Sequence, residues 1–345
     1  MSTNKRIVWI DYLKAFTCFL VALGHLIQSF QIAGITYNLT LSKFVIFYIY
    51  LFHMPLFMCI SGYLYNKKSK MISKNEYKRF ELKKLMNLMI PYITFYLVYL
   101  GINILFSKEV NTPRGKNELI GILNNPMSPY WFLYTLMSIF IVTPVLENIF
   151  NRDNVKVFIC YSILKVISIF YMPPIYFIKS IMMYGVYFYF GCFIYDKKVL
   201  SKKINIFMAI MDFICAIVLF KYSKLLNIYI YEFLAVFMAV LGIIICVEGF
   251  KTIQNSKILN TFKDYTFQIF LMHTIFAAGV RIILLKIGIT NYFIHFVLGI
   301  SASIYIPVLV SKLSKKILYT EFFFFPVKTI EEIKERKIEN VRKKT

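Results

Sequence analysis

Acidic residues are scarce in this sequence: 17 Asp and Glu stand beside 40 Lys and Arg in 345 residues, which gives a formal net charge of +23. Only 17% of the residues are charged, whereas 59% are hydrophobic and the mean hydropathy is +0.65. So little charge excludes an ordinary soluble domain and indicates a membrane protein. Because the basic residues lie in short segments between apolar runs, we expect no binding to nucleic acid.

Cysteine motifs are missing as well. The six cysteines are scattered singly through apolar runs, and the sequence has no CxxC and no Cys/His cluster. We therefore expect neither disulfides nor a metal site, and we interpret the cysteines as small packing residues. The first apolar segment also lacks the small-residue cleavage site of a signal peptide.

Long apolar runs dominate what is present. Windows of about 20 apolar residues predict an all-α, polytopic membrane protein with about ten transmembrane helices. The expected spans lie at residues 7–30, 42–65, 85–106, 130–150, 157–172, 178–195, 204–221, 228–249, 264–285 and 291–311. We expect them to form one transmembrane domain, residues 1–318, followed by a basic, amphipathic cytoplasmic tail, residues 319–345.

The distribution of Lys and Arg predicts the orientation of these spans. With ten spans, 29 of the 40 basic residues fall on one side and 7 on the other, and four lie within spans or at their edges. Cytoplasmic segments carry the excess of Lys and Arg, so both termini are expected in the cytoplasm. We therefore predict a multi-pass protein of the inner (cytoplasmic) membrane, surrounded by membrane lipids.

The first span carries three ionisable residues on one face of the expected helix. At 100° per residue, Lys14 and His25 project within about 20° of each other, and Asp11 lies about 40° to the other side of His25. An ionisable residue in the middle of a span costs about 2.5–3.5 kcal/mol on insertion scales. The shared face therefore predicts a hydrophilic interior rather than contact with lipid.

Two interpretations of this face remain open. Asp11 and Lys14 are three residues apart and can form a structural ion pair. A lone histidine in a span commonly forms a hydrogen bond to a neighbouring helix. The combination of the three residues favours a functional site, and Gly24 leaves room beside His25 for a neighbouring helix or a ligand.

A second basic cluster lies where the third span begins, on the expected cytoplasmic side. Arg79, Lys83 and Lys84 either anchor the helix at the membrane surface or bind the phosphates of a cytoplasmic cofactor. The second span ends nearby, where Pro55 frees a backbone carbonyl and Ser61 follows closer to the inner surface.

Later spans add further polar groups. His273 and Arg281 lie eight residues apart in one span, about 80° apart around the helix. A buried His and Arg in one span again indicate a hydrophilic interior. Trp131 opens the fourth span at the outer surface, where an aromatic belt is expected. We interpret His53 as a packing or carbonyl-bonding residue, with a second titratable group as the alternative, and His295 as a surface or packing residue.

Together these segments resemble the acyltransferase family 3 of polytopic membrane proteins, and within it the fucose 4-O-acetylase-like group, which acylates sugar hydroxyls of surface glycans. The first-helix pattern of that family is a basic residue, ten positions and a histidine, matched here by Lys14 and His25. Many members have Arg where this chain has Lys14, and some have a further basic residue where it has Asn87. The segments that carry the resemblance are WIDYLKAFTCFLVALGH, FHMPLFMCISGYLY, LKKLMNLMIPY, SPYWFLYTLMSIFIVTP and YTFQIFLMHTIF.

The resemblance implies transfer of an acyl group, usually acetyl from cytoplasmic acetyl-CoA, to a hydroxyl of a glycan or sugar acceptor at the outer face. His25 would be the general base or would itself carry the acyl group briefly, with Lys14 and Asp11 fixing the cofactor or the helix lower down. The other candidates are Arg79, Lys83, Lys84 and Ser61 for cofactor binding, and Trp131, His273 and Arg281 for the substrate path.

Two other functions fit the same intramembrane charges. A transporter or flippase of a lipid-linked glycan would line its route with them and form no bond. A membrane sensor or scaffold would tolerate replacement of Lys14 and His25 with losses of stability alone.

Overall fold

The computed structural model describes residues 7–69, 74–194 and 200–342. The outermost residues of the expected domain and tail, 1–6 and 343–345, and residue 195 of the sixth expected span lie outside this part. The helices are α1 (Val8–Ile32), α2 (Leu39–Ser69), α3 (Lys74–Leu105), α4 (Glu118–Asn124), α5 (Trp131–Ile149), α6 (Asn154–Phe170), α7 (Tyr176–Phe190), the 3-10 turn η1 (Gly191–Phe193), α8 (Lys202–Tyr222), α9 (Ile228–Lys251), α10 (Lys257–Asn260), η2 (Lys263–Tyr265), α11 (Thr266–Lys286), α12 (Tyr292–Ser314), α13 (Leu318–Glu321) and α14 (Pro326–Arg342).

The all-α, polytopic architecture predicted from the apolar runs is confirmed. Within the described residues, eight helices are long and apolar enough to cross a membrane: α1, α2, α3, α5, α8, α9, α11 and α12. The fifth and sixth expected spans correspond to α6 and α7, which are shorter, at 17 and 15 residues. The number of ten spans and the cytoplasmic termini remain predictions.

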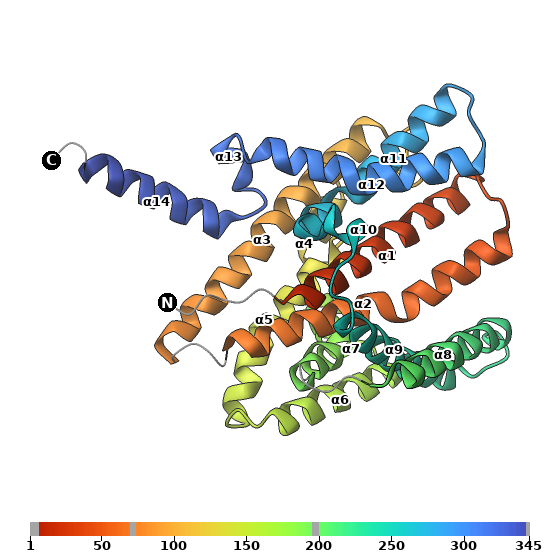
Figure 1. Ribbon diagram of the computed structural model, residues 1–345, viewed down its shortest axis with the longest axis horizontal. Helices are drawn as coiled ribbons and strands as arrows, with labels where there is room; N and C mark the ends of the chain where they lie inside the picture. Colours follow the sequence, from red (N-terminus) through yellow and green to blue (C-terminus); the bar gives the residue numbers. More distant parts are fainter. Residues whose placement is uncertain (1–6, 70–73, 195–199, 343–345) are drawn as a thin grey trace.

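Helix α1 lies at the centre of the bundle. It packs against α2 on one side and against α11 and α12 on the other (Figure 1), and also against α9. Most of its span, 72%, is buried inside the protein, compared with 17% for α8 at the periphery. The helix that carries Asp11, Lys14 and His25 is thus the most buried of the eight candidate membrane helices in the described part of the chain.

Helices α2 and α7 approach each other so closely that only glycine fits between them. A Cβ atom on Gly62 would lie 1.7 Å from the carbonyl oxygen of Phe188, and one on Gly191 would lie 2.0 Å from that of Cys59. Backbone thus packs directly on backbone, as small residues allow in membrane bundles. This contact fixes α2, which lines two of the three cavities described below.

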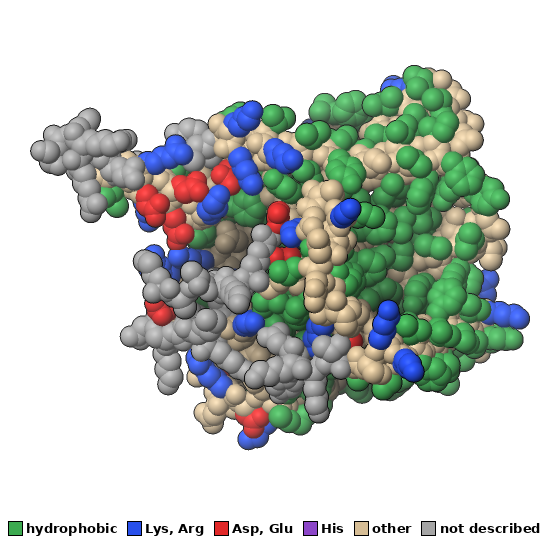
Figure 2. Space-filling view, viewed as in Figure 1, with side chains coloured by type: hydrophobic (Ala, Val, Ile, Leu, Met, Phe, Trp, Pro, Cys, Tyr) green, Lys and Arg blue, Asp and Glu red, His purple; other side chains and the backbone are tan. Residues whose placement is uncertain are grey.

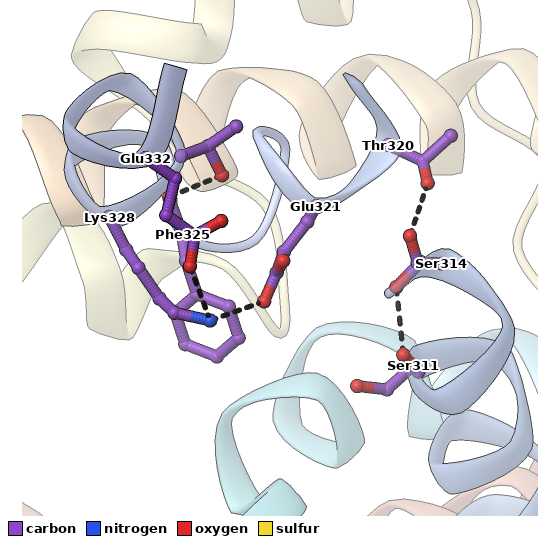
Figure 3. A network of polar contacts seen from close by, with 8 residues as sticks. Ser311, Ser314, Thr320, Glu321, Phe325, Lys328 and Glu332 are labelled. Carbon is purple, nitrogen blue, oxygen red and sulfur yellow. Dashed lines mark hydrogen bonds and ion pairs between the residues drawn. The ribbon is translucent and has the colours of Figure 1, made fainter. Parts of the chain in front are cut away.

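The C-terminal helix α14 extends beyond the bundle (Figure 1) and contacts α3. Many of the charged side chains visible in Figure 2 gather at this end, whereas the rest of that face is largely hydrophobic. In Figure 3, Lys328 forms ion pairs with Glu321 and Glu332, at 2.9 and 3.3 Å. These contacts, led by the hydrogen bond to Glu321, raise the pKa of Lys328 and tie α14 to the chain before it.

Candidate active site

His25 lies between two cavities. It lines one cavity of about 540 Å³, bounded by α1, α2, α5, α6, α7, α9 and α11, and a second of about 640 Å³, bounded by α1, α3, α11 and the segment after α3. Gln28, one helical turn further along α1, also lines both. Ser128 also lines both, so the two cavities adjoin at these residues, and an imidazole in this position can face ligands in either one.

Two side chains position the imidazole. The Tyr50 ring lies next to Gly24, where a Cβ would come within 2.7 Å of it, and its centroid is 6.4 Å from that of His25. The His273 ring lies 5.2 Å from His25, centroid to centroid. The His273 Nδ1 contacts the Phe270 carbonyl at 2.8 Å, so it carries the hydrogen and leaves Nε2 as an acceptor. The space expected at Gly24 is thus occupied by Tyr50.

The first cavity, which we call the aromatic cavity, has walls of aromatic rings. Trp131 and Tyr184 pack with ring centroids 5.2 Å apart. Two ionisable residues of opposite sign, Lys165 and Glu232, also line it, and they form no ion pair in the described part of the chain. The further aromatic residues of this wall are Phe47, Tyr50, Tyr187, Tyr231 and Phe270.

The second cavity, which we call the arginine cavity, has a buried cation on its wall. Arg281 is only 3% exposed, and its Nη1 donates a hydrogen bond to the Ser29 hydroxyl. The Asn111 side-chain amide donates to the Ser29 carbonyl at 2.8 Å, which holds the segment after α3 against α1. The predicted path residues Trp131 and Arg281 therefore lie in different cavities that meet at His25.

Asp11 and Lys14 are placed elsewhere. Lys14 Nζ lies 2.8 Å from Asp11 Oδ1, so the ion pair proposed from their spacing is formed. Neither residue lines the aromatic cavity or the arginine cavity. Asp11, Lys14 and His25 share a face of α1, but Asp11 and Lys14 lie at one end of it and His25 lies at the cavities near the other end.

A third cavity, of about 470 Å³, brings together most of the predicted cofactor residues. Ser61, Lys83 and Lys84 line it, and Arg79 does not. Lys84 Nζ lies 4.1 Å from the ring centroids of both Tyr65 and Phe80. We call this space the inner cavity, because the expected topology places it on the cytoplasmic side.

The tail helix closes one side of the inner cavity. Val327, Lys328 and Glu331 of α14 line it. Glu331 forms an ion pair with Lys83, which lowers the pKa of the Glu331 carboxyl. The Val327 amide donates to the Asn87 side chain at 3.3 Å, so Asn87, one of the departures from the family pattern, serves to hold the tail.

The inner cavity shares no lining residue with the two cavities at His25. All the same, α2 runs past both places: Ser61 lines the inner cavity and Pro55 the aromatic cavity. Six residues of helix correspond to about 9 Å along the axis. Between them the ring of Phe57 packs on Phe132, with centroids 5.5 Å apart.

Sequence reasoning missed several residues of the site. Lys165 and Glu232 are ionisable residues inside apolar runs, a signal that singles out functional positions in membrane proteins. Gln28 lies three residues after His25 and therefore on the same face of α1. Tyr50 gave no such signal, since an aromatic residue in a span is ordinary.

Other polar groups have structural surroundings. His295 is buried and its Nε2 contacts the Ile289 carbonyl at 2.8 Å, in keeping with a packing role. All six cysteines are free. In the described part of the chain, no three His, Cys, Asp or Glu side chains are grouped so that they could hold a metal ion.

Comparisons with known proteins agree with the resemblance found in the motifs. Residues 7–312 match the family model of the acyltransferase 3 domain, described as an acyltransferase domain.

Two curated relatives are named nodulation protein NolL. The chain is 30% identical to that of Mesorhizobium japonicum over 155 residues, 44% of this chain and 39% of the relative. It is 33% identical to that of Sinorhizobium fredii over 141 residues, 41% of this chain and 36% of the relative. The matched part thus spans well under half of either relative, and no solved structure matches the chain significantly.

Proposed function

The chain belongs to the acyltransferase 3 family, and from this premise we propose that it is an O-acyltransferase of the cytoplasmic membrane that moves an acetyl group from acetyl-CoA to a sugar hydroxyl of a glycan. One observation carries the proposal: His25 lines two adjoining cavities inside the bundle. This position allows an acyl donor in one cavity and an acceptor in the other to be held next to the same base, as catalysis by proximity requires.

The inner cavity is the entry for the donor. Lys83 and Lys84 supply cations for the CoA phosphates, and Arg79 adds positive charge at the exposed mouth. The pantetheine arm then follows α2 past Ser61 toward the aromatic cavity. This path requires the packed rings of Phe57 and Phe132 to move apart.

The acyl group meets the acceptor at His25. The imidazole takes the proton of the acceptor hydroxyl while its oxygen attacks the thioester carbonyl carbon. The carbon–sulfur bond then breaks, CoA leaves as the thiolate, and the proton on His25 returns to that sulfur. An imidazole suits this role because its ordinary pKa lies near neutral pH.

Each remaining candidate has a supporting role. His273 orients the His25 ring, Trp131 packs beside the thioester in the aromatic cavity, and Arg281 lies on the acceptor side. Asp11 and Lys14 fix α1 at its inner end through their ion pair.

The test is replacement of His25 by Ala in the full chain, with the acetylated glycan measured by mass spectrometry. Loss of the base should lower the transfer rate about 10²–10⁴-fold. The matched control is His295→Ala, since His295 is a buried histidine that lines none of the three cavities. Unchanged acetylation in a His25→Ala variant that inserts normally would refute the role of His25.

A covalent acetyl-histidine would favour the other mechanism open from the sequence. The intact mass of the protein, measured after brief mixing with acetyl-CoA alone, distinguishes the two. Direct transfer predicts no mass increase in the absence of acceptor.

A further inference from the structure

Arg281 is a buried cation without a carboxylate partner. Its side chain is 3% exposed, and the hydrogen bond to the Ser29 hydroxyl is the one hydrogen bond of the guanidinium to the residues that the structure describes. A guanidinium has five N–H donors, so most of its capacity is unused. An unpaired charge in the membrane interior is costly and is normally balanced by a partner or a ligand.

The walls of the arginine cavity offer no balancing charge. None of its described lining residues is Asp or Glu. The other cation, Arg114, is already paired with Glu118 at 3.3 Å. The Thr274 hydroxyl, buried on the same wall, has no hydrogen-bond partner in the described part of the chain. The cavity thus combines a free positive charge with an unused hydroxyl, which fits an anion with several acceptor oxygens.

One edge of this cavity is apolar and exposed. Ile32, Phe106 and Ile283 line it and are 57%, 49% and 61% exposed. All three lie at or near the ends of membrane-spanning helices, so this edge faces the hydrocarbon of the bilayer or its border. A ligand that enters here can keep an aliphatic chain in lipid while its anionic head reaches Arg281.

We propose that the arginine cavity binds the phosphate of a lipid-linked acceptor, with Arg281 as the specificity-determining residue. The proposal deepens the function given above and rests on it for the statement that the bound lipid is an acceptor. Ser29 lies four residues after His25, about 6 Å along α1. A phosphate held by Arg281 therefore places the first sugar attached to it beside His25.

The binding step can be measured without any acyl transfer. The full chain in detergent is titrated with farnesyl phosphate and, separately, with farnesol, and the complexes are counted by native mass spectrometry. The wild type should bind the phosphate at least about tenfold more tightly than the alcohol, because a charge-assisted hydrogen bond contributes about 1.5–3 kcal/mol. Arg281→Gln should abolish this preference, and Arg281→Lys should retain part of it.

Lys286→Gln is the matched control. Lys286 lies on the same helix, is paired with Glu109 and is exposed to solvent, so the preference for the phosphate should persist in this variant. Equal binding of the two probes by the wild type, or a preference that survives in Arg281→Gln, would overturn the proposal. So would displacement of farnesyl phosphate by glucuronic acid at equal concentration, which would assign Arg281 to an acidic sugar instead.

The outcome separates this inference from the proposed function. A chain that prefers farnesyl phosphate through Arg281 but transfers no acetyl group would refute the enzymatic role and leave the lipid-phosphate site intact. Normal acetyl transfer by the Arg281→Gln variant would refute the role of Arg281 in binding the acceptor and leave the enzymatic role intact.

Discussion

The two ends of α1 differ in whether the basic residues around them form ion pairs. Where α1 begins, basic residues are matched: Lys14 with Asp11, and nearby Lys251 with Glu248. In the half around His25, Arg281 and Lys165 form no ion pair among the described residues, although both are buried. Both regions belong to one bundle and share one central helix.

This difference separates structural charge from functional charge. A buried pair satisfies itself and needs no ligand, whereas a buried cation without a partner is stable only if something else supplies the opposite charge. On the proposed function, the N-terminal end of α1 therefore holds the bundle together, and the half around His25 receives the substrates. Three substitutions test this division, beginning with the framework that both regions need.

The largest effect is expected at the contact between α2 and α7. Gly62→Ala would place a methyl group 1.7 Å from the Phe188 carbonyl oxygen, so the helices must separate. Overpacking against rigid backbone should cost about 3 kcal/mol or more. Thermal unfolding of the purified protein measures the loss, and both regions should lose order together.

Gly101→Ala is the matched control for this substitution. Gly101 also lies inside a membrane helix, but nothing stands within 4 Å of its would-be Cβ. The variant should be as stable as the wild type, or more stable by about 0.5–1 kcal/mol. If Gly62→Ala behaved in the same way, the direct backbone contact would be disproved.

The second test breaks the ion pair at the inner end of α1. Lys14→Met alone removes the cation that lies 2.8 Å from the buried Asp11 carboxylate. It should destabilise the protein by about 3 kcal/mol, the lower end for breaking a buried pair, because Lys14 is partly exposed. The double variant Lys14→Met/Asp11→Leu removes both charges and should recover most of that stability. Unfolding and acetyl transfer are measured on the same preparations.

Recovery of transfer in the double variant would assign the pair to structure. A double variant that is stable but inactive would contradict a purely structural role for the ion pair, because Lys14 would then act on the cofactor directly. The analogous pair Glu248 and Lys251 provides the reference for a purely structural loss.

The smallest effect is expected at the tail. Glu331→Gln frees Lys83 from its ion pair and should lower the KM for acetyl-CoA about two- to threefold, since exposed pairs contribute at most about 1 kcal/mol. Lys83 lowers the pKa of Glu331, so the ion pair is present at neutral pH and is lost as the pH falls through that lowered value. The difference between variant and wild type should therefore vanish only below that lowered pKa, which lies under the ordinary glutamate value of 4.5. A KM that is unchanged at pH 7 would show that Lys83 does not contact the donor.

The sequence predicted the helices and pointed to individual candidate residues, but it did not predict which of these residues lie together in the fold. Apolar length alone was sufficient for the all-α bundle, and the unusual charges marked His25, His273 and Arg281 before any packing was known. Helical periodicity also placed Lys14 and Asp11 within reach of each other. These are local properties, and they follow from the chain without its tertiary contacts.

What periodicity cannot supply is the identity of the neighbouring helix. The contact between Arg281 and Ser29 joins residues 252 positions apart. Tyr50 reaches the site because Gly24 leaves space for it, and Glu331 covers Lys83 because α14 folds back on α3. Each depends on how helices pack, which no single segment encodes.

On the proposed function, the placement of donor and acceptor in different cavities beside His25 has a kinetic consequence. Neither substrate has to pass through the compartment of the other, so the enzyme is free to load them in either order and needs no obligatory first arrival. An unreactive analogue of acetyl-CoA would then leave binding of the acceptor in the arginine cavity unaffected. Its inhibition would be noncompetitive with respect to the sugar.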